Sequence, residues 1–320
     1  MVHARSFSFT DEATSVALPS PIRVPSASGG RLSAPDPSVH LFQLRRLQSQ
    51  WYQAMFQGDS NDQLPHSTRF KWEMCQRMRE WSEALPSGLS GDLREMLDLE
   101  LRYSYVYCIA PSARTPNITA YDRILIFEHA IAYIGRLYDI AHSDTSKTFY
   151  TYHDALRVYF MGSQFFAVLR DAADVLLTGS NVAIPLSLPD EPPAPPLPEG
   201  FSRPVGGDSL DRSLDTLEKV SLTLKKYGER WEYGLQLMGS FEMMSARVMS
   251  DLKARRELRD AKASALSQAE QSQGRHQLPI SQPIPNYTQR TPLPQHMLSQ
   301  QGLQEMRWAE GYDSGMSNLR

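Results

Sequence analysis

The feature that most constrains this chain is a helical spacing of apolar residues, which recurs in nearly every segment between its proline-rich stretches. Apolar side chains follow one another at intervals of three and four residues, and this spacing places them on one face of an α-helix. The sequence shows no convincing alternation of apolar and polar residues, the pattern that marks a half-buried strand. It therefore predicts an all-α fold: a multi-helix array with a long C-terminal helical segment and disordered tails.

Five helical segments lie within residues 38–180, which we expect to form a helical core. Ser38, Ser67 and Thr119 stand at positions suited to N-caps, because their side-chain oxygens can accept hydrogen bonds from the first turn of a helix. Gly179 stands where the fifth helix is expected to end. The residues predicted to be buried in this core are Trp51, Trp81, Leu97, Tyr105, Ile131 and Phe165.

Three stretches interrupt the helical pattern and divide the chain. Residues 1–37 are rich in Ser, Pro and Ala and have few large apolar side chains, which predicts a disordered N-terminal tail. Residues 181–207 form a proline-rich linker, because proline removes a backbone donor and disfavours helix in the residue before it. Residues 269–320 are rich in Gln and Pro and are predicted to be a disordered tail.

Residues 208–268 carry the most regular apolar spacing and are predicted to be a long helical segment that packs on the core. Glycines at 228, 234 and 239 favour a bend or break, since glycine is a poor helix former. The same spacing is also typical of an intermolecular coiled coil. The candidate partner-binding residues, called the seam below, are Leu217, Leu224, Trp231, Met238 and Phe241.

Composition narrows the class of protein. The formal net charge is −3 and the isoelectric point is near 6.3, which argues against a generally basic nucleic-acid binder. The charge run from Lys253 to Lys262 is interpreted as a solvated helix end, with a nucleic-acid contact or nuclear-import patch as the alternative. The sequence has no apolar run long enough to span a bilayer and no recognisable signal or transit peptide. We therefore expect a soluble intracellular protein with no membrane partner.

Motifs that carry chemistry are missing from the sequence. It contains neither a Gly-x-Ser-x-Gly elbow nor a glycine-rich phosphate loop. His129, His142 and His153 lie near helix ends without a metal-ligand spacing, so we expect no metal, no cofactor and no catalytic residue. Cys75 and Cys108 are too few for a disulfide scaffold and are predicted to be small core residues. The alternative is a helical enzyme, or enzyme accessory subunit, whose acids meet only in the fold; the candidate acids are Glu100, Asp122 and Glu128.

Four blocks of the sequence resemble a known family. They are QLRRLQSQWYQAMFQ, KWEMCQRMREWSEALP, LELRYSYVYCIAPSARTPNITAYDRILIFEHAIAYI and TYHDALRVYFMGSQFFAVL. Their order and spacing resemble the C-terminal half of the fungal-specific transcription factor domain, the middle homology region of Zn(II)2Cys6 binuclear-cluster regulators. The resemblance covers residues 38–180 and extends more loosely to 250. The front half of that region and the cysteine-rich zinc cluster are not found in this sequence, so no DNA-reading residue can be assigned.

The resemblance implies a transcription-regulator-like protein that acts through a helical regulatory and partner-binding region. It implies control of a metabolic or secondary-metabolite gene cluster and a location in the nucleus, or in the cytoplasm with access to the nucleus. Expected partners are a full-length regulator or a second copy of this chain as a homodimer, together with a small-molecule effector. Sequence-specific DNA binding by this chain alone is not expected. A further alternative is a structural dimer built on residues 209–266.

Overall fold

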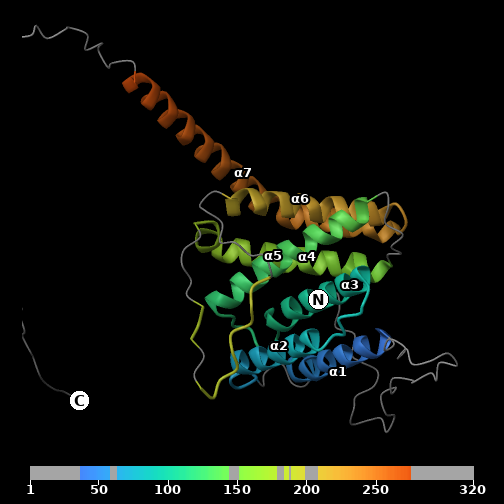
Figure 1. The fold of residues 1–320 in the computed structure, drawn as a ribbon. Coiled ribbons are helices and arrows are strands. Elements are labelled where there is room, and N and C mark those ends of the chain that lie inside the picture. The colour runs from blue at the N-terminus through green and yellow to red at the C-terminus, as the bar shows by residue number, and fades with distance from the viewer. Residues whose placement is uncertain are drawn as a thin grey trace, which may run out of the picture. The chain divides into compact units, whose positions relative to one another are not determined.

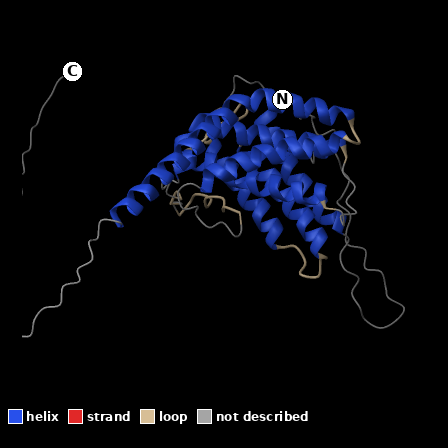
Figure 2. Cartoon of the chain, turned by 90° about the horizontal axis from the view of Figure 1, so that it is seen from above, coloured by secondary structure: helices blue, strands red, loops and turns tan. Residues whose placement is uncertain are grey.

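The computed structural model describes residues 37–57, 63–143, 151–178, 184–186, 189–198 and 208–274. These residues form seven α-helices and contain no strand (Figures 1 and 2). The helices are α1 (Pro37–Phe56), α2 (Ser67–Glu83), α3 (Gly91–Ile109), α4 (Ala120–His142), α5 (Tyr152–Thr178), α6 (Asp208–Gly228) and α7 (Glu232–Gly274). The predicted all-α array is confirmed.

The helix bounds can be compared with the predicted segments in the part of the chain that the structure describes. The predicted core holds α1 to α5, although α1 begins at Pro37, one residue before the expected boundary. Helix α7 continues to Gly274, past the expected end at residue 268. The tails predicted to be disordered otherwise lie outside the described residues. The chain divides into two compact units, Met1–Ala269 and Glu270–Arg320, and the helical core belongs to the first.

Helix α4 occupies the middle of the first unit, because it packs against α3, α5 and α6 (Figure 1). Helices α1, α2 and α3 pack against one another on one side. The first half of α7 returns along α5 and α6: Tyr159 and Ser240 share a hydrogen bond of 3.1 Å, and Phe241 is fully buried beside Gly162. The helices after the proline-rich stretch therefore pack back on the core, as predicted.

Most of the predicted core is buried. Trp51, Leu97 and Phe165 have almost no exposed surface, and Trp81 and Tyr105 are also buried. Ile131 is only half-buried and packs at the edge of the core, so its prediction was too strong. In the part of the chain that the structure describes, no helix combines the length and the apolar character needed to cross a membrane.

Of the three predicted N-cap residues, only Thr119 occupies the N-cap position in the structure. Thr119 forms a full capping box with Asp122: the Thr119 side chain accepts from the Asp122 backbone N–H at 3.0 Å, and the Asp122 carboxylate accepts from the Thr119 N–H at 2.9 Å. Ser67 is already the first residue of α2, and its N-cap is His66 in a left-handed conformation (φ 52°) without a side-chain cap. Ser38 likewise lies inside α1. Gly179 lies outside the described residues.

The expected break in the C-terminal segment is confirmed between α6 and α7. A Cβ atom on Gly234 would lie 2.7 Å from the backbone nitrogen of Gly228, so the two helix ends meet too closely for a side chain there. Helix α5 also deviates from a continuous helix, because Ala172 adopts φ −143° and ψ 29°. The sequence near Ala172 contains no proline or glycine that would predict this kink.

Candidate functional site

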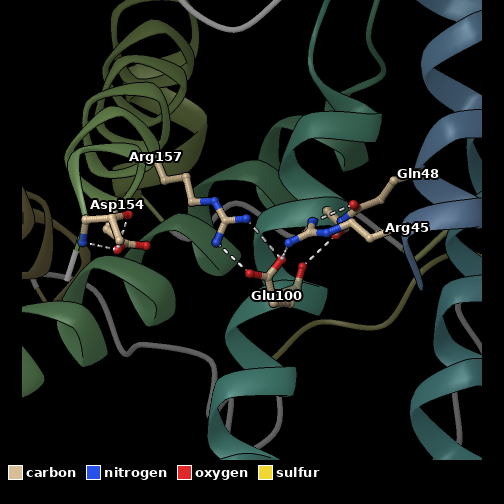
Figure 3. Close-up of polar contacts among 7 residues, drawn as sticks. Arg45, Gln48, Glu100, Asp154 and Arg157 are labelled. Atoms are coloured by element: carbon tan, nitrogen blue, oxygen red, sulfur yellow. Dashed lines mark hydrogen bonds and ion pairs between the residues drawn. The ribbon is translucent and has the colours of Figure 1, made fainter. Parts of the chain in front are cut away.

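A buried ion-pair cluster joins three helices of the core around Glu100 of α3 (Figure 3). The Glu100 carboxylate accepts two hydrogen bonds from Arg157 of α5, at 2.5 and 3.2 Å, and pairs with Arg45 of α1 at 3.0 Å. The Glu100 side chain is only 10% exposed. Because a charge with so little solvent contact needs a partner, these arginines are what allow an acid to lie at this position.

The side chains around this cluster complete its hydrogen bonds. Arg45 donates to Gln48 at 2.6 Å, and Gln48 donates to the Ser104 hydroxyl at 2.6 Å. The Arg157 guanidinium also lies 4.9 Å from the centre of the Tyr103 ring. Burial raises the pKa of Tyr103 to about 12. Arg45, Glu100 and Arg157 each have at least one partner in this cluster, and we interpret the cluster as a clamp between α1, α3 and α5.

The other two candidate acids have different partners. One carboxylate oxygen of Asp122 caps α4, and the other accepts from the Trp72 indole N–H at 3.1 Å. Glu128 accepts two hydrogen bonds from Arg212 of α6, at 3.2 and 2.6 Å. Glu100, Asp122 and Glu128 are all buried, but each lies in a separate set of contacts. The arrangement gives the enzyme alternative no shared acid site, and the absence of catalytic residues stays a prediction.

A buried lysine between α2 and α3 was not predicted from the sequence. Lys71 is 1% exposed, and its ammonium donates to the Ile109 carbonyl at 3.0 Å. Burial lowers the pKa of Lys71, while Asp122 opposes this shift. The helical spacing could have predicted the burial of Lys71, because Lys71 lies four residues before Cys75 and therefore on the face of α2 that carries its buried residues.

The two cysteines lie beside this lysine and are fully buried, which confirms that they are core residues. The Cys108 thiol lies 3.9 Å from the Lys71 carbonyl oxygen. Burial, together with the neighbouring Cys108, raises the pKa of Cys75 well above its ordinary value. A thiol that stays protonated is a weak nucleophile, so Cys75 behaves as an apolar core residue.

The three histidines do not meet. His129 is buried, and its Nε2 atom lies 3.0 Å from the Pro196 carbonyl. His142 stacks on Tyr138 at the end of α4, and His153 is exposed. In the described residues, no group of three His, Cys, Asp or Glu side chains could hold a metal ion.

A described part of the proline-rich linker lies against the core. We call residues 189–198 the strap; its sequence is PDEPPAPPLP and it contains neither helix nor strand. Tyr121 of α4 donates to the Pro195 carbonyl at 2.7 Å, and Arg69 of α2 donates to the Asp190 carbonyl at 3.0 Å. Together with His129, these contacts fasten the strap to α2 and α4. The sequence predicted an extended linker but no surface to receive it.

The seam is covered by the chain itself. Leu217, Leu224 and Phe241 are fully buried, and Trp231 and Met238 are partly buried. Helix α6 packs on α4 and α5, which is the intramolecular interpretation of this segment. Three of the five seam residues are therefore covered within the chain, and the partner-binding role of the seam stays a prediction.

Comparison of this chain with protein-family models, with curated proteins and with solved structures found no match.

Proposed function

We propose that this chain is a helical regulatory module that acts on transcription in the nucleus by binding other proteins. The sequence resemblance to the middle homology region motivates this proposal. One structural observation supports it most strongly, and it concerns the part of α7 that extends past the core.

Residues 253–268, called the outer half of α7, lie in the part of this helix that extends past the other helices (Figure 1). Almost all of their side chains are exposed. The base of the outer half is held to the core by ion pairs from Arg255 to Asp174 and from Arg259 to Asp211, both at 2.7 Å. Exposed ion pairs of this kind contribute little stability. The predicted interpretation of Lys253 to Lys262 as a solvated helix end agrees with this exposure.

An apolar stripe follows the outer half of α7. Ala254, Leu258, Ala261 and Ala265 recur at intervals of four, three and four residues, and all four are exposed. Leu258, the largest side chain of the stripe, has 58% of its surface exposed. A stripe of this spacing is typical of a helix that packs on a second helix, and small residues allow a close approach. An isolated helix of this length is marginal in water, so a partner helix would stabilise it.

The proposal is tested by tethering the full chain to an unrelated DNA-binding domain and measuring a reporter gene. We expect the fusion to change reporter output relative to the DNA-binding domain alone. The double variant Leu258→Lys/Ala265→Lys places charges on the stripe and should abolish that change. Leu266→Lys is the matched control, because Leu266 is 66% exposed but lies off the stripe. Equal output from the fusion and from the DNA-binding domain alone would contradict the proposal.

The proposal also requires that DNA recognition come from a partner. Specific recognition needs an element placed in a groove with side chains that reach base edges, and the resemblance assigns no such element here. Purified full chain at physiological salt should enrich no motif from a pool of randomised duplexes. Enrichment of a defined motif would show that the chain reads DNA itself.

A further inference from the structure

The sequence of the strap favours the polyproline II conformation of a proline-rich ligand. Six of its ten residues are proline, and five of its residues precede a proline. Proline fixes its own φ near −65° and restricts the preceding residue to extended or polyproline II geometry. In that geometry the backbone makes no internal hydrogen bonds, so its carbonyls are free to accept from another surface. The strap is therefore preorganised and loses little entropy when it docks.

The surface that receives the strap donates hydrogen bonds to those carbonyls. We call Arg69, Tyr121 and His129 the strap receptor; they bond the carbonyls of Asp190, Pro195 and Pro196 at 3.0, 2.7 and 3.0 Å. Because a carbonyl oxygen can only accept, Nε2 of His129 carries the proton. Burial lowers the pKa of His129 to about 4, so this imidazole is neutral at physiological pH.

Aromatic rings hold the two inner donors in position. The Trp72 ring contacts the Tyr121 ring edge to face at 6.1 Å, and Tyr105 contacts His129 in the same way at 5.1 Å. Pro195 is buried, and Ala194 and Leu197 pack against the core cluster. Rigid aromatic donors that bind main-chain carbonyls, with buried proline between them, are the features by which proteins recognise polyproline II segments.

We infer that the strap receptor is a binding site for a proline-rich segment of another protein, and that the chain's own strap is its resident ligand. The hydrogen bonds that carry this inference go to main-chain carbonyls, and Pro195 is buried. Any polyproline II segment of similar pattern presents such carbonyls and such a proline. The partner would displace the strap. This site is separate from the outer half of α7, so neither proposal depends on the other.

A second copy of this chain is a poor candidate for the displacing ligand. Its strap would make the same contacts as the resident strap and would also lose translational and rotational freedom on association. The resident strap competes at an effective concentration that reaches the millimolar range for short connections. A different protein can overcome this advantage by making additional contacts, which a second copy of the strap cannot.

The first experiment removes the resident ligand. Residues 189–198 are replaced by Gly and Ser at constant length, and a labelled peptide with the strap sequence is titrated by fluorescence anisotropy. We expect the substituted chain to bind the peptide, and the intact chain to bind it roughly tenfold more weakly or worse, because its own strap competes. A peptide with Pro195 and Pro196 replaced by Ala should not bind. No binding by a substituted chain with unchanged helical content overturns the inference.

Single-atom variants then test the receptor in the substituted chain. Tyr121→Phe removes only the hydroxyl that donates to Pro195 and should weaken peptide binding about fivefold, the value of one neutral hydrogen bond. Tyr159→Phe is the matched control, since its hydroxyl contacts Ser240 on α7 and should leave binding unchanged. Equal peptide affinities for the two variants would show that the peptide does not use the receptor.

A second measurement uses the intact strap and does not depend on the substituted chain folding. Glu191 is exposed, and both native cysteines are buried, so a dye attached to Glu191→Cys labels the strap selectively. Excess unlabelled strap peptide should produce a saturable change in dye emission as the strap is displaced. The peptide with Pro195 and Pro196 replaced by Ala should produce none. The peptide is added to about 10 mM, several times the effective concentration of the resident strap. Dye emission that does not change at that peptide concentration overturns the inference.

Discussion

Gly162 lies where α5 closely approaches α6 and α7, and replacing it tests that packing directly. A Cβ atom at this position would lie 2.8 Å from Cγ1 of Val220 on α6 and 3.0 Å from the Phe241 ring on α7. Val220 and Phe241 are fully buried. Val220 is also β-branched and therefore has little rotamer freedom with which to move aside. One added methyl group must consequently displace a helix or a buried side chain.

The expected magnitude comes from two opposing terms. Replacing glycine by alanine inside a helix stabilises it by about 1 kcal/mol. Overpacking a dense core costs about 1–3 kcal/mol. Gly162→Ala should therefore lower the free energy of unfolding by about 1 kcal/mol. Gly239→Ala is the matched control, because Gly239 is an exposed position inside α7 where an added Cβ atom would meet nothing within 4 Å, and it should raise that free energy by about 1 kcal/mol.

Urea unfolding of the two variants and the parent chain measures this difference of about 2 kcal/mol. A double-mutant cycle with Val220→Ala identifies the cause. Removing the Val220 methyl groups should cost less in the Gly162→Ala background than in the parent, because the new methyl group occupies the vacated space. Equal stabilisation by Gly162→Ala and Gly239→Ala would refute the proposed packing, and so would a cost of Val220→Ala that is the same in both backgrounds.

Three further predictions concern charge, pH and the seam. Glu100→Gln should lower the free energy of unfolding by about 3 kcal/mol, because it leaves the buried Arg157 charge unpaired. Glu95→Gln, in the more exposed pair with Arg136, should lower it by less than about 1 kcal/mol. Equal losses of unfolding free energy in urea would contradict the clamp. Burial lowers the pKa of His129 from 6.5 to about 4, so His129 takes up a proton in the unfolded chain before it does so in the folded chain as the pH falls. The stability that comes from keeping His129 neutral is complete above about pH 6.5 and declines by up to about 3 kcal/mol toward pH 4. The free energy of unfolding of His129→Phe should therefore decline less steeply between pH 7 and pH 5 than that of the parent chain. Trp231→Lys should lower the melting temperature without changing the oligomeric state measured by sedimentation, since most of the seam is buried within the chain. A change from dimer to stable monomer would instead support the partner-binding interpretation.

The helices themselves could be predicted because their causes are local. The apolar spacing of α2 determines which of its faces is buried. The cap of α4 is formed by Thr119 and Asp122, which are only three positions apart. The break near Gly228 was likewise expected from glycine's low helix propensity. His66 shows where such reasoning fails, since a left-handed residue takes the cap position that Ser67 was expected to fill.

Partners far apart in sequence were decided only by the tertiary structure. Apolar spacing specifies that Leu217 and Phe241 are buried but not what covers them, because a helix of the same chain and a helix of another chain offer the same apolar surface. Glu100 meets Arg157 across 57 residues, and His129 meets the Pro196 carbonyl across 67. No periodicity relates such residues, since their contacts depend on how whole helices pack against one another. The sequence determined that the chain is a set of amphipathic helices with a proline-rich interruption, and the packing of those helices decided that the interruption is bound as a strap.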